Sequence, residues 1–181
     1  MSRSKNLVVC CAFLGLLAAC QNAPHTPPPI STALDTGAAS DIAVTGRISL
    51  STEPLPGQSA QAFIAQFHLQ GSSAQGQITL QTPTGNLLAV LHWQPGSATL
   101  SQAGQADQPY ADLPTLLRAV MGPAAPEPAL LLAWLQGQSG SHPDWQVDLG
   151  QYASAGLIVA QRLQPLPRTH IRIKLDSKHE Q

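Results

Sequence analysis

Charged residues are scarce in this sequence. Lys, Arg, Asp and Glu make up 10% of the 181 residues, and the formal net charge is −1. A nucleic-acid-binding protein needs a clustered basic face to neutralise phosphates. The densest basic stretch is Arg168, Arg172, Lys174 and Lys178, whose spacing is typical of a strand and forms no such cluster. The composition therefore argues against a nucleic-acid partner.

Motifs for catalysis are also missing. The sequence has no P-loop, no dinucleotide-binding fingerprint and no H-E-x-x-H motif. Residues 137–141 begin like the G-x-S-x-G nucleophile motif, but Ser141 occupies the final glycine position and no strand precedes it. The acidic residues are isolated, apart from Asp144 and Asp148, which are four apart and offer no defensible acid–base pair. We expect no enzymatic activity and no cofactor.

The histidines give no clear metal motif. His68, His92 and His170 fall in three separate stretches that are predicted as strands. Three strands can bring three imidazoles together, but nothing in this spacing requires it. We therefore expect no metal site.

Cysteine is confined to the N-terminus, where Cys10, Cys11 and Cys20 are the only three in the chain. Arg3 and Lys5 precede an apolar run from Leu7 to Ala19. Spanning a bilayer takes roughly 20 apolar residues, so this run predicts a signal peptide over residues 1–19. Cleavage would leave Cys20 as the only cysteine, which excludes a disulfide within one chain.

The end of the signal peptide has a more specific pattern. Leu17-Ala18-Ala19-Cys20 resembles the lipobox of bacterial lipoprotein precursors, in which the cysteine is acylated and becomes the mature N-terminus. The alternative is a plain cleavage site followed by an incidental cysteine. Acylation would remove a thiol that is a liability in an oxidising compartment. We therefore predict lipidation at Cys20.

Residues 20–40 read as a tether between this anchor and a domain over residues 41–177. The segment is rich in Pro, Ser, Ala and Thr without apolar periodicity. Extended at about 3.1 Å per residue, it reaches ~60 Å. Seven basic against ten acidic residues remain after cleavage, a net charge of −3. This balance predicts no attraction to anionic lipid, so we expect the acyl chains to provide membrane attachment.

From residue 41 onward, apolar and polar residues alternate. The pattern recurs in residues 42–50, 63–70, 77–81, 145–149 and 170–175. Such alternation predicts an antiparallel sheet with one apolar and one solvated face. Residues 87–93 and 157–163 are apolar at both phases, which predicts strands covered on both sides.

The middle of the domain changes to a helical period. Residues 113–120 place leucine and valine at i, i+3, i+4 and i+7, between a potential N-cap at Asp112 and a stop at Gly122. A second helix is predicted over 128–136, ended by Gly137 and apolar nearly all round, which is typical of a buried helix. Helices against the apolar face of a curved sheet suit a packed core or a cup for an apolar ligand, and the packed core is the commoner outcome.

Short motifs follow one another in a particular order along the chain. They are Gly46-Arg47, residues 63–67 before a polar turn, Thr82-Pro83 with Gly85, Gln94-Pro95-Gly96, Met121-Gly122, residues 133–137 and residues 171–175. Together with the lipobox, their order and the helix placement resemble the LolB family of outer-membrane lipoproteins. The resemblance covers roughly residues 42–176.

This resemblance implies a mainly β fold with short helices, an incompletely closed antiparallel barrel whose apolar cavity the helices cover. It implies a monomeric receptor that accepts cargo lipoproteins from a periplasmic LolA-like carrier and inserts them into the outer membrane. The apolar strand and helix residues then become cavity lining instead of packed core. The candidates are Phe63, Phe67, Ile78, Leu80, Leu116, Leu117, Val120, Leu131, Trp134 and Leu135.

Two positions bear on the membrane in the light of this resemblance. Gln21 directly follows the lipidated cysteine. An Asp at this position would favour retention in the inner membrane, and Gln does not, so we expect the protein at the periplasmic side of the outer membrane. LolB-like proteins carry a bulky apolar residue at the tip of the turn that here is Pro83-Thr84-Gly85, and that residue contacts the membrane. Thr84 departs from this pattern. Leu87 and Leu88 are nearby, but we expect both to be paired within a strand.

Two other functions fit the same sequence. One is another acyl-ligand-binding or stress-sensing envelope lipoprotein of similar architecture. The other is a structural lipoprotein with a solid core that scaffolds an outer-membrane complex. Binding of an apolar probe separates the scaffold from the other two.

Overall fold

The computed structural model describes residues 41–176 apart from residue 58. The predicted signal peptide (1–19), the lipidated Cys20, the tether to residue 40 and the predicted domain end at residue 177 lie outside the described residues. Within them, no helix is long and apolar enough to span a membrane.

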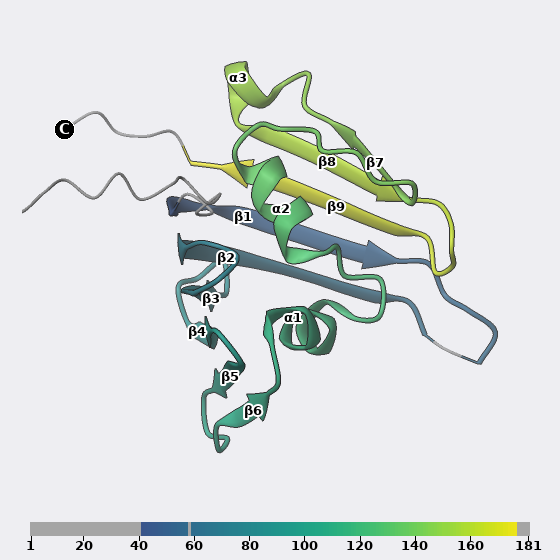
Figure 1. Cartoon of the computed structure of the whole chain (residues 1–181). Coiled ribbons are helices and arrows are strands. Elements are labelled where there is room, and N and C mark those ends of the chain that lie inside the picture. The colour runs from purple at the N-terminus through teal and green to yellow at the C-terminus, as the bar shows by residue number, and fades with distance from the viewer. Residues whose placement is uncertain (1–40, 58, 177–181) are drawn as a thin grey trace, which may run out of the picture. The chain divides into compact units, whose positions relative to one another are not determined.

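The domain is built on one antiparallel sheet of nine strands in the order β6-β5-β4-β3-β2-β1-β9-β8-β7 (Figure 1). The strands are β1 (Ile42–Thr52), β2 (Gln61–Gly71), β3 (Gly76–Gln81), β4 (Leu87–Gln94), β5 (Ser97–Gln102), β6 (Gln108–Tyr110), β7 (Trp145–Asp148), β8 (Leu157–Arg162) and β9 (Thr169–Leu175). Since β6 and β7 are free edges, the sheet does not close. This confirms the predicted mainly β, incompletely closed antiparallel fold.

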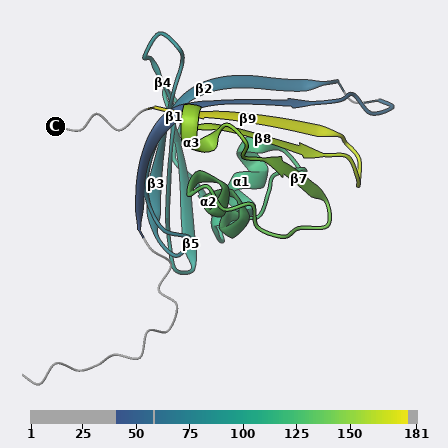
Figure 2. The same cartoon turned by 90° about the horizontal axis from the view of Figure 1, so that it is seen from above.

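The sheet is sharply bent, and the helices lie inside the bend (Figure 2). We call the side that faces the helices the inner face and the opposite side the outer face. β1 pairs with β2 along its whole length, but with β9 only from Gly46 to Thr52. A Cβ atom at Gly46 would overlap the carbonyl oxygen of Lys174 and lie 3.1 Å from Phe67 Cε1. Glycine therefore allows the close backbone approach where the β1–β9 pairing ends.

Two of the three helices match the sequence prediction. α1 (Leu113–Met121) begins at Asp112, whose carboxylate accepts a hydrogen bond of 2.8 Å from the backbone N–H of Thr115. It ends at Gly122, which has a φ of 86°. α2 (Pro128–Leu135) is followed by Gly137, as predicted. Capping chemistry accounts for the ends of α1, whereas Glu127 before α2 makes no capping side-chain hydrogen bond.

Three elements were not predicted: β5, β6 and α3 (Tyr152–Ala155). In β5 only Ala98 and Leu100 face inward between small polar residues, so the periodic signal is weak. The prediction that residues 87–93 are covered on both sides was wrong, because Leu87 and Leu88 are exposed on a sheet whose outer face carries no helix. In β8, likewise, only Ile158 and Ala160 are fully buried.

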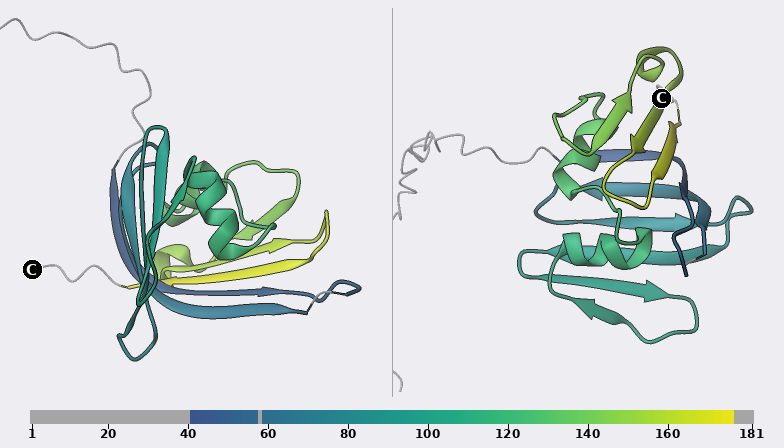
Figure 3. Two further views of the ribbon diagram at one scale, coloured as in Figure 1. Left: turned by 90° about the horizontal axis from the view of Figure 1, so that it is seen from below. Right: turned by 90° about the vertical axis from the view of Figure 1, so that its right-hand side faces the viewer.

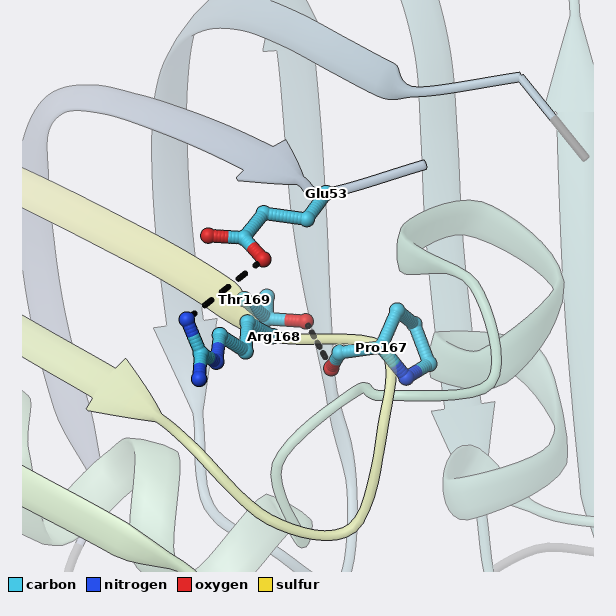
Figure 4. Close-up of polar contacts among 4 residues, drawn as sticks. All are labelled: Glu53, Pro167, Arg168 and Thr169. Carbon is cyan, nitrogen blue, oxygen red and sulfur yellow. Dashed lines mark hydrogen bonds and ion pairs between the residues drawn. The ribbon is translucent and has the colours of Figure 1, made fainter. Parts of the chain in front are cut away.

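The β1–β2 and β8–β9 loops meet at one end of the sheet. The backbone N–H of Glu53 donates to the carbonyl oxygen of Arg168 at 2.9 Å. Their side chains form an ion pair with an N–O distance of 3.9 Å, and the Thr169 hydroxyl donates to the Pro167 carbonyl at 3.2 Å (Figure 4). These contacts hold β9 against β1 at this end.

Candidate functional site

An entirely apolar pocket lies between the inner face of the sheet and the helices α1 and α2. Eight of the ten predicted cavity residues line it: Phe63, Phe67, Ile78, Leu80, Leu117, Val120, Leu131 and Leu135. Five lining residues were not among the candidates: Ile48, Leu69, Leu91, Met121 and Ile173. Ile48, Leu69 and Ile173 lie on the apolar side of the alternating stretches. Their position on that side was the signal by which the sequence could have identified them as lining residues.

The structure places Leu116 and Trp134 elsewhere. Both are completely buried, but neither lines the pocket. The Trp134 ring packs edge-on against Trp145 with 5.3 Å between centroids, and its indole N–H donates to the Ser139 carbonyl at 3.0 Å. Trp134 thus ties α2 to the loop and strand that follow it. Sequence could not separate it from the lining residues, because α2 is apolar nearly all round.

The pocket is small, with a volume of about 50 Å³. A site for a drug-sized ligand typically holds roughly 300 Å³ or more. Its walls are side chains without a polar group, so it can offer dispersion and burial but no directed hydrogen bond. A long apolar ligand therefore fits only if α1 and α2 move away from the sheet.

A larger open cleft of about 850 Å³ adjoins this pocket, where β1 begins and β9 and α3 end. Leu135 lines both spaces and so stands between them. The Tyr152 hydroxyl of α3 donates to the Leu135 carbonyl at 3.0 Å. Gly137 packs closely against the Tyr152 ring, which a Cβ at this position would overlap. The C-terminal end of α2 is therefore fastened beside the cleft.

The β3–β4 hairpin projects from the bend of the sheet, away from the helices (Figures 2 and 3). Its tip, Pro83-Thr84-Gly85, is exposed and polar. The Thr84 hydroxyl lies 2.8 Å from the Thr82 hydroxyl and accepts a hydrogen bond of 3.2 Å from the Asn86 side-chain amide. Thr84 thus closes the turn internally, and Gly85 supplies its φ of 88°.

Two apolar side chains lie at the base of this hairpin. Leu87 pairs with Gln81 and Ala89 with Leu80, so a β-bulge leaves Leu88 without a partner in the register. Leu87 is 48% exposed and Leu88 40%. The expectation that both are paired within a strand holds for Leu87 alone. A bulge exposes two consecutive leucines that alternation would have separated.

Polar chemistry is sparse in the described part of the chain. Residues 41–176 without residue 58 contain no group of three His, Cys, Asp or Glu residues that could hold a metal ion. His68, His92 and His170 lie on β2, β4 and β9, three strands that are not neighbours of one another. Hydrogen bonding by the Thr115 side chain and backbone lowers the pKa of Asp112 below its ordinary 3.8, which reflects helix capping.

The family comparison agrees with this geometry. No curated protein matches this chain. A family model described as outer membrane lipoprotein LolB matches residues 40–164, which is more than half of the chain and includes α1, α2 and the β3–β4 hairpin. The match confirms the resemblance in the sequence. The chain therefore belongs to the LolB family of outer-membrane lipoproteins.

Proposed function

We propose that this protein accepts lipoproteins from a LolA-like periplasmic carrier, holds their acyl chains beneath α1 and α2, and inserts them into the outer membrane. The LolB family serves lipoprotein trafficking and does not consist of enzymes. The observation that carries the proposal is the pocket whose lining is apolar on every side. Acyl chains need a dry, undirected surface and no catalyst, and burial stabilises them by about 0.8 kcal/mol per methylene.

The small pocket volume implies that loading is coupled to movement of the helices. Both helices pack on the sheet through side chains, and Tyr152 fastens the end of α2. An arriving acyl chain replaces the contacts that Leu117, Leu131 and Leu135 make with the sheet. The exchange of one apolar contact for another leaves little free-energy difference to overcome. Leu135, between the pocket and the open cleft, is then the first side chain to move.

The anchor completes this scheme. Cleavage after Ala19 and acylation of Cys20 attach the chain to the outer membrane at its periplasmic side. The protein acts as a monomer, because one domain carries both the pocket and the hairpin. The carrier and the receptor exchange cargo pocket to pocket, so the acyl chains stay away from water.

Two neighbouring positions on α1 provide a matched test of the pocket. Val120 lines the pocket and is partly buried, whereas Ala119 is exposed and does not line it. We expect Val120→Asp to weaken binding of a fluorescent apolar probe by at least about tenfold, because desolvating a carboxylate costs more than the ~1.4 kcal/mol that this factor represents. Ala119→Asp should leave binding unchanged. Transfer of a lipoprotein from a loaded carrier should likewise be weakened by Val120→Asp and not by Ala119→Asp.

The same measurements decide against the proposal if it is wrong. Equal probe binding by the two variants, with thermal melting showing that both are folded, would remove the pocket from the function. A domain that binds no probe and stays empty beside a loaded carrier would behave as a scaffold. The small pocket volume is the observation that favours this alternative function. A scaffold should instead retain protein partners when isolated from membranes.

We further propose that the hairpin delivers cargo to the membrane through Leu87 and Leu88, while the tip at Pro83-Thr84-Gly85 remains a polar turn. The two leucines are exposed at the base of a projecting element. Burial of one such side chain in lipid is worth about 1.5–3 kcal/mol, less what its present partial burial already contributes. In this protein two leucines, three and four residues after Thr84, thus take the place of the family's apolar residue at the tip.

Serine at both positions tests this assignment. The double variant Leu87→Ser with Leu88→Ser should still take cargo from the carrier but deliver it to liposomes more slowly. Thr84→Leu should strengthen association of the untethered domain with liposomes by adding a third apolar group. Thr84→Val, which removes the hydroxyl with little added bulk, controls for loosening of the turn. Unchanged delivery by the double serine variant would assign the hairpin a connecting role only.

A further inference from the structure

The outer face of the sheet gathers basic residues that are distant in sequence. Alternation places Arg47 of β1 and Arg172 and Lys174 of β9 on this face, and all three are exposed. Arg47 is directly opposite Lys174 in the register, and Arg172 is opposite Ser49. Adjacent strands are about 4.8 Å apart, so the three cations form one group, which we call the basic strip.

Acidic residues on the outer face lie at its edge and at the ends of its strands. Among the described residues, Asp148 is at an outward position of the edge strand β7, two strands away from Arg172. Asp41 and Asp176 lie just outside β1 and β9 and line the same cleft as Lys174, so the part of the strip that is farthest from acids is Arg47 and Arg172. The ion pair between Arg168 and Glu53 is the only one within the described part of the chain (Figure 4). The Lys174 ammonium donates to the Ala155 carbonyl, so Arg47 and Arg172 are the members of the basic strip that are available to an external anion.

An exposed apolar residue stands beside the basic strip. Ile64 of β2 is 63% exposed on the outer face, opposite Ser49, which separates it from Arg172. The β3–β4 hairpin projects on the same side of the bent sheet (Figures 2 and 3). The Gln66 side chain donates to the Pro83 carbonyl at 3.1 Å and so fastens the hairpin to the strand that carries Ile64. Cations and apolar groups thus face one direction.

We propose that the outer face of β2, β1 and β9 is a docking surface for anionic phospholipid, with the basic strip on the phosphates and Ile64 in the interfacial layer. Cations next to exposed apolar side chains are the pattern of proteins that lie on a membrane surface. The charge complementarity arises although the domain as a whole is acidic, because Arg47 and Arg172 lie in the middle of the sheet and the acids of this face lie at its edge and at the strand ends. This proposal goes beyond cargo transfer and does not depend on it.

The length of chain before the domain is compatible with this occupant. Twenty residues separate Cys20 from Asp41. Extended at about 3.1 Å per residue they span ~60 Å, which lets the domain turn its outer face to the bilayer that holds the anchor. An acidic protein would also be attracted by the basic strip, but a lipid surface accounts for Ile64, Leu87 and Leu88 as well.

Vesicle binding by the untethered domain tests the charges. A version of residues 37–181 contains every strand, helix and core residue named above, because all of them lie within residues 41–176, so we expect it to fold on its own. It should sediment with vesicles of equal parts phosphatidylcholine and phosphatidylglycerol, less so at high salt, and not with phosphatidylcholine alone. Arg47→Gln with Arg172→Gln should weaken binding about fivefold for each cation removed. Arg118→Gln with Arg162→Gln, the same charge change away from the basic strip, should not.

Site-specific labels test the orientation. The domain has no cysteine, since all three lie at or before residue 20. An environment-sensitive fluorophore at Ile64→Cys should shift to the blue on the anionic vesicles. The same fluorophore at Ala119→Cys, exposed on α1, should not shift.

The proposal would be overturned if the two double arginine variants lost vesicle binding equally, or if the fluorescence of the two labels shifted equally. Vesicle binding that does not depend on lipid charge would overturn it as well. Unchanged vesicle binding together with lost binding of the carrier, in the Arg47 and Arg172 double variant, would identify the outer face as a protein surface. Probe binding in solution without vesicles should be the same in this variant as in the wild type. A loss of probe binding through Val120→Asp alone would concern the pocket and leave the docking surface standing.

Discussion

On β9, Ile171 and Ile173 face inward and are each 1% exposed, whereas Arg172 between them is exposed on the outer face. The same contrast runs across the sheet. The inner face is apolar and covered by α1 and α2, and the outer face is polar, uncovered and basic at its centre. One set of strands therefore presents two surfaces of opposite chemistry to two different environments.

Under the two proposals above, a small protein with few charged residues uses one sheet for two kinds of contact with lipid. The inner face excludes water and suits acyl chains, which carry no charge. The outer face bears the charges that phosphate groups attract. Because each strand alternates, neither surface constrains the other, and substitutions on one face should leave the other working. The predictions below test that independence.

The largest effect should come from adjacent residues of β9. Ile173→Ala removes a side chain that is buried at the pocket, so we expect it to lower the free energy of unfolding by about 2–5 kcal/mol. Arg172→Ala should change it by no more than about 0.5 kcal/mol. Urea denaturation of residues 37–181 measures both. Similar values for the two variants would mean that the faces are not independent.

The next effect concerns the close approach of β1 and β9. Gly46→Ala introduces a Cβ that overlaps the Lys174 carbonyl and crowds Phe67, which lines the pocket. We expect a loss of about 1–3 kcal/mol in the free energy of unfolding, together with altered probe binding. Thr45→Ala, the exposed neighbour, serves as the control and should be close to neutral. A stable Gly46→Ala domain would show that β9 can shift at this point.

A smaller effect should appear where α2 is fastened to α3. Tyr152→Phe removes the hydrogen bond to the Leu135 carbonyl, which should cost about 1 kcal/mol and free the end of α2. Stopped-flow probe binding should then become faster, while vesicle binding stays the same. Slower or unchanged probe binding would show that α2 does not need to move for the pocket to fill.

The smallest effect is the pH dependence of α1. The pKa of Asp112 is lowered in the folded protein, so its carboxylate stabilises the fold above the ordinary value of 3.8, and this contribution disappears as pH falls through the lowered value. Asp112→Asn keeps a capping side chain without the charge. The difference in unfolding free energy between wild type and variant should therefore shrink on acidification below pH 4. A difference that stays constant with pH would exclude the carboxylate as its source. Thr115→Val removes the side-chain hydrogen bond that lowers the pKa of Asp112, so it should reduce this pH dependence in part.

Much of the fold was readable in the sequence because strand and helix periods are local. Alternation located β1, β2, β3, β7 and β9, and capping residues located both ends of α1. The order of short motifs indicated the family, which the family match confirms. β5 escaped because its alternation is short and built mostly on small residues, and β6 escaped because it has only three residues.

The sequence by itself determined which residues are apolar, where the longer helices and most strands run and which family the chain belongs to, since these depend on neighbours along the chain. Only the tertiary structure decided which apolar residues form the pocket, for Trp134 and Leu131 look alike until packing sets one against Trp145 and the other at the pocket. It also decided that Leu88 is exposed and that Arg47 lies opposite Lys174. Pairing of β1 with β9 brings residues together that are more than a hundred positions apart, and the choice of such a distant partner strand is a property of the folded sheet that no local pattern contains.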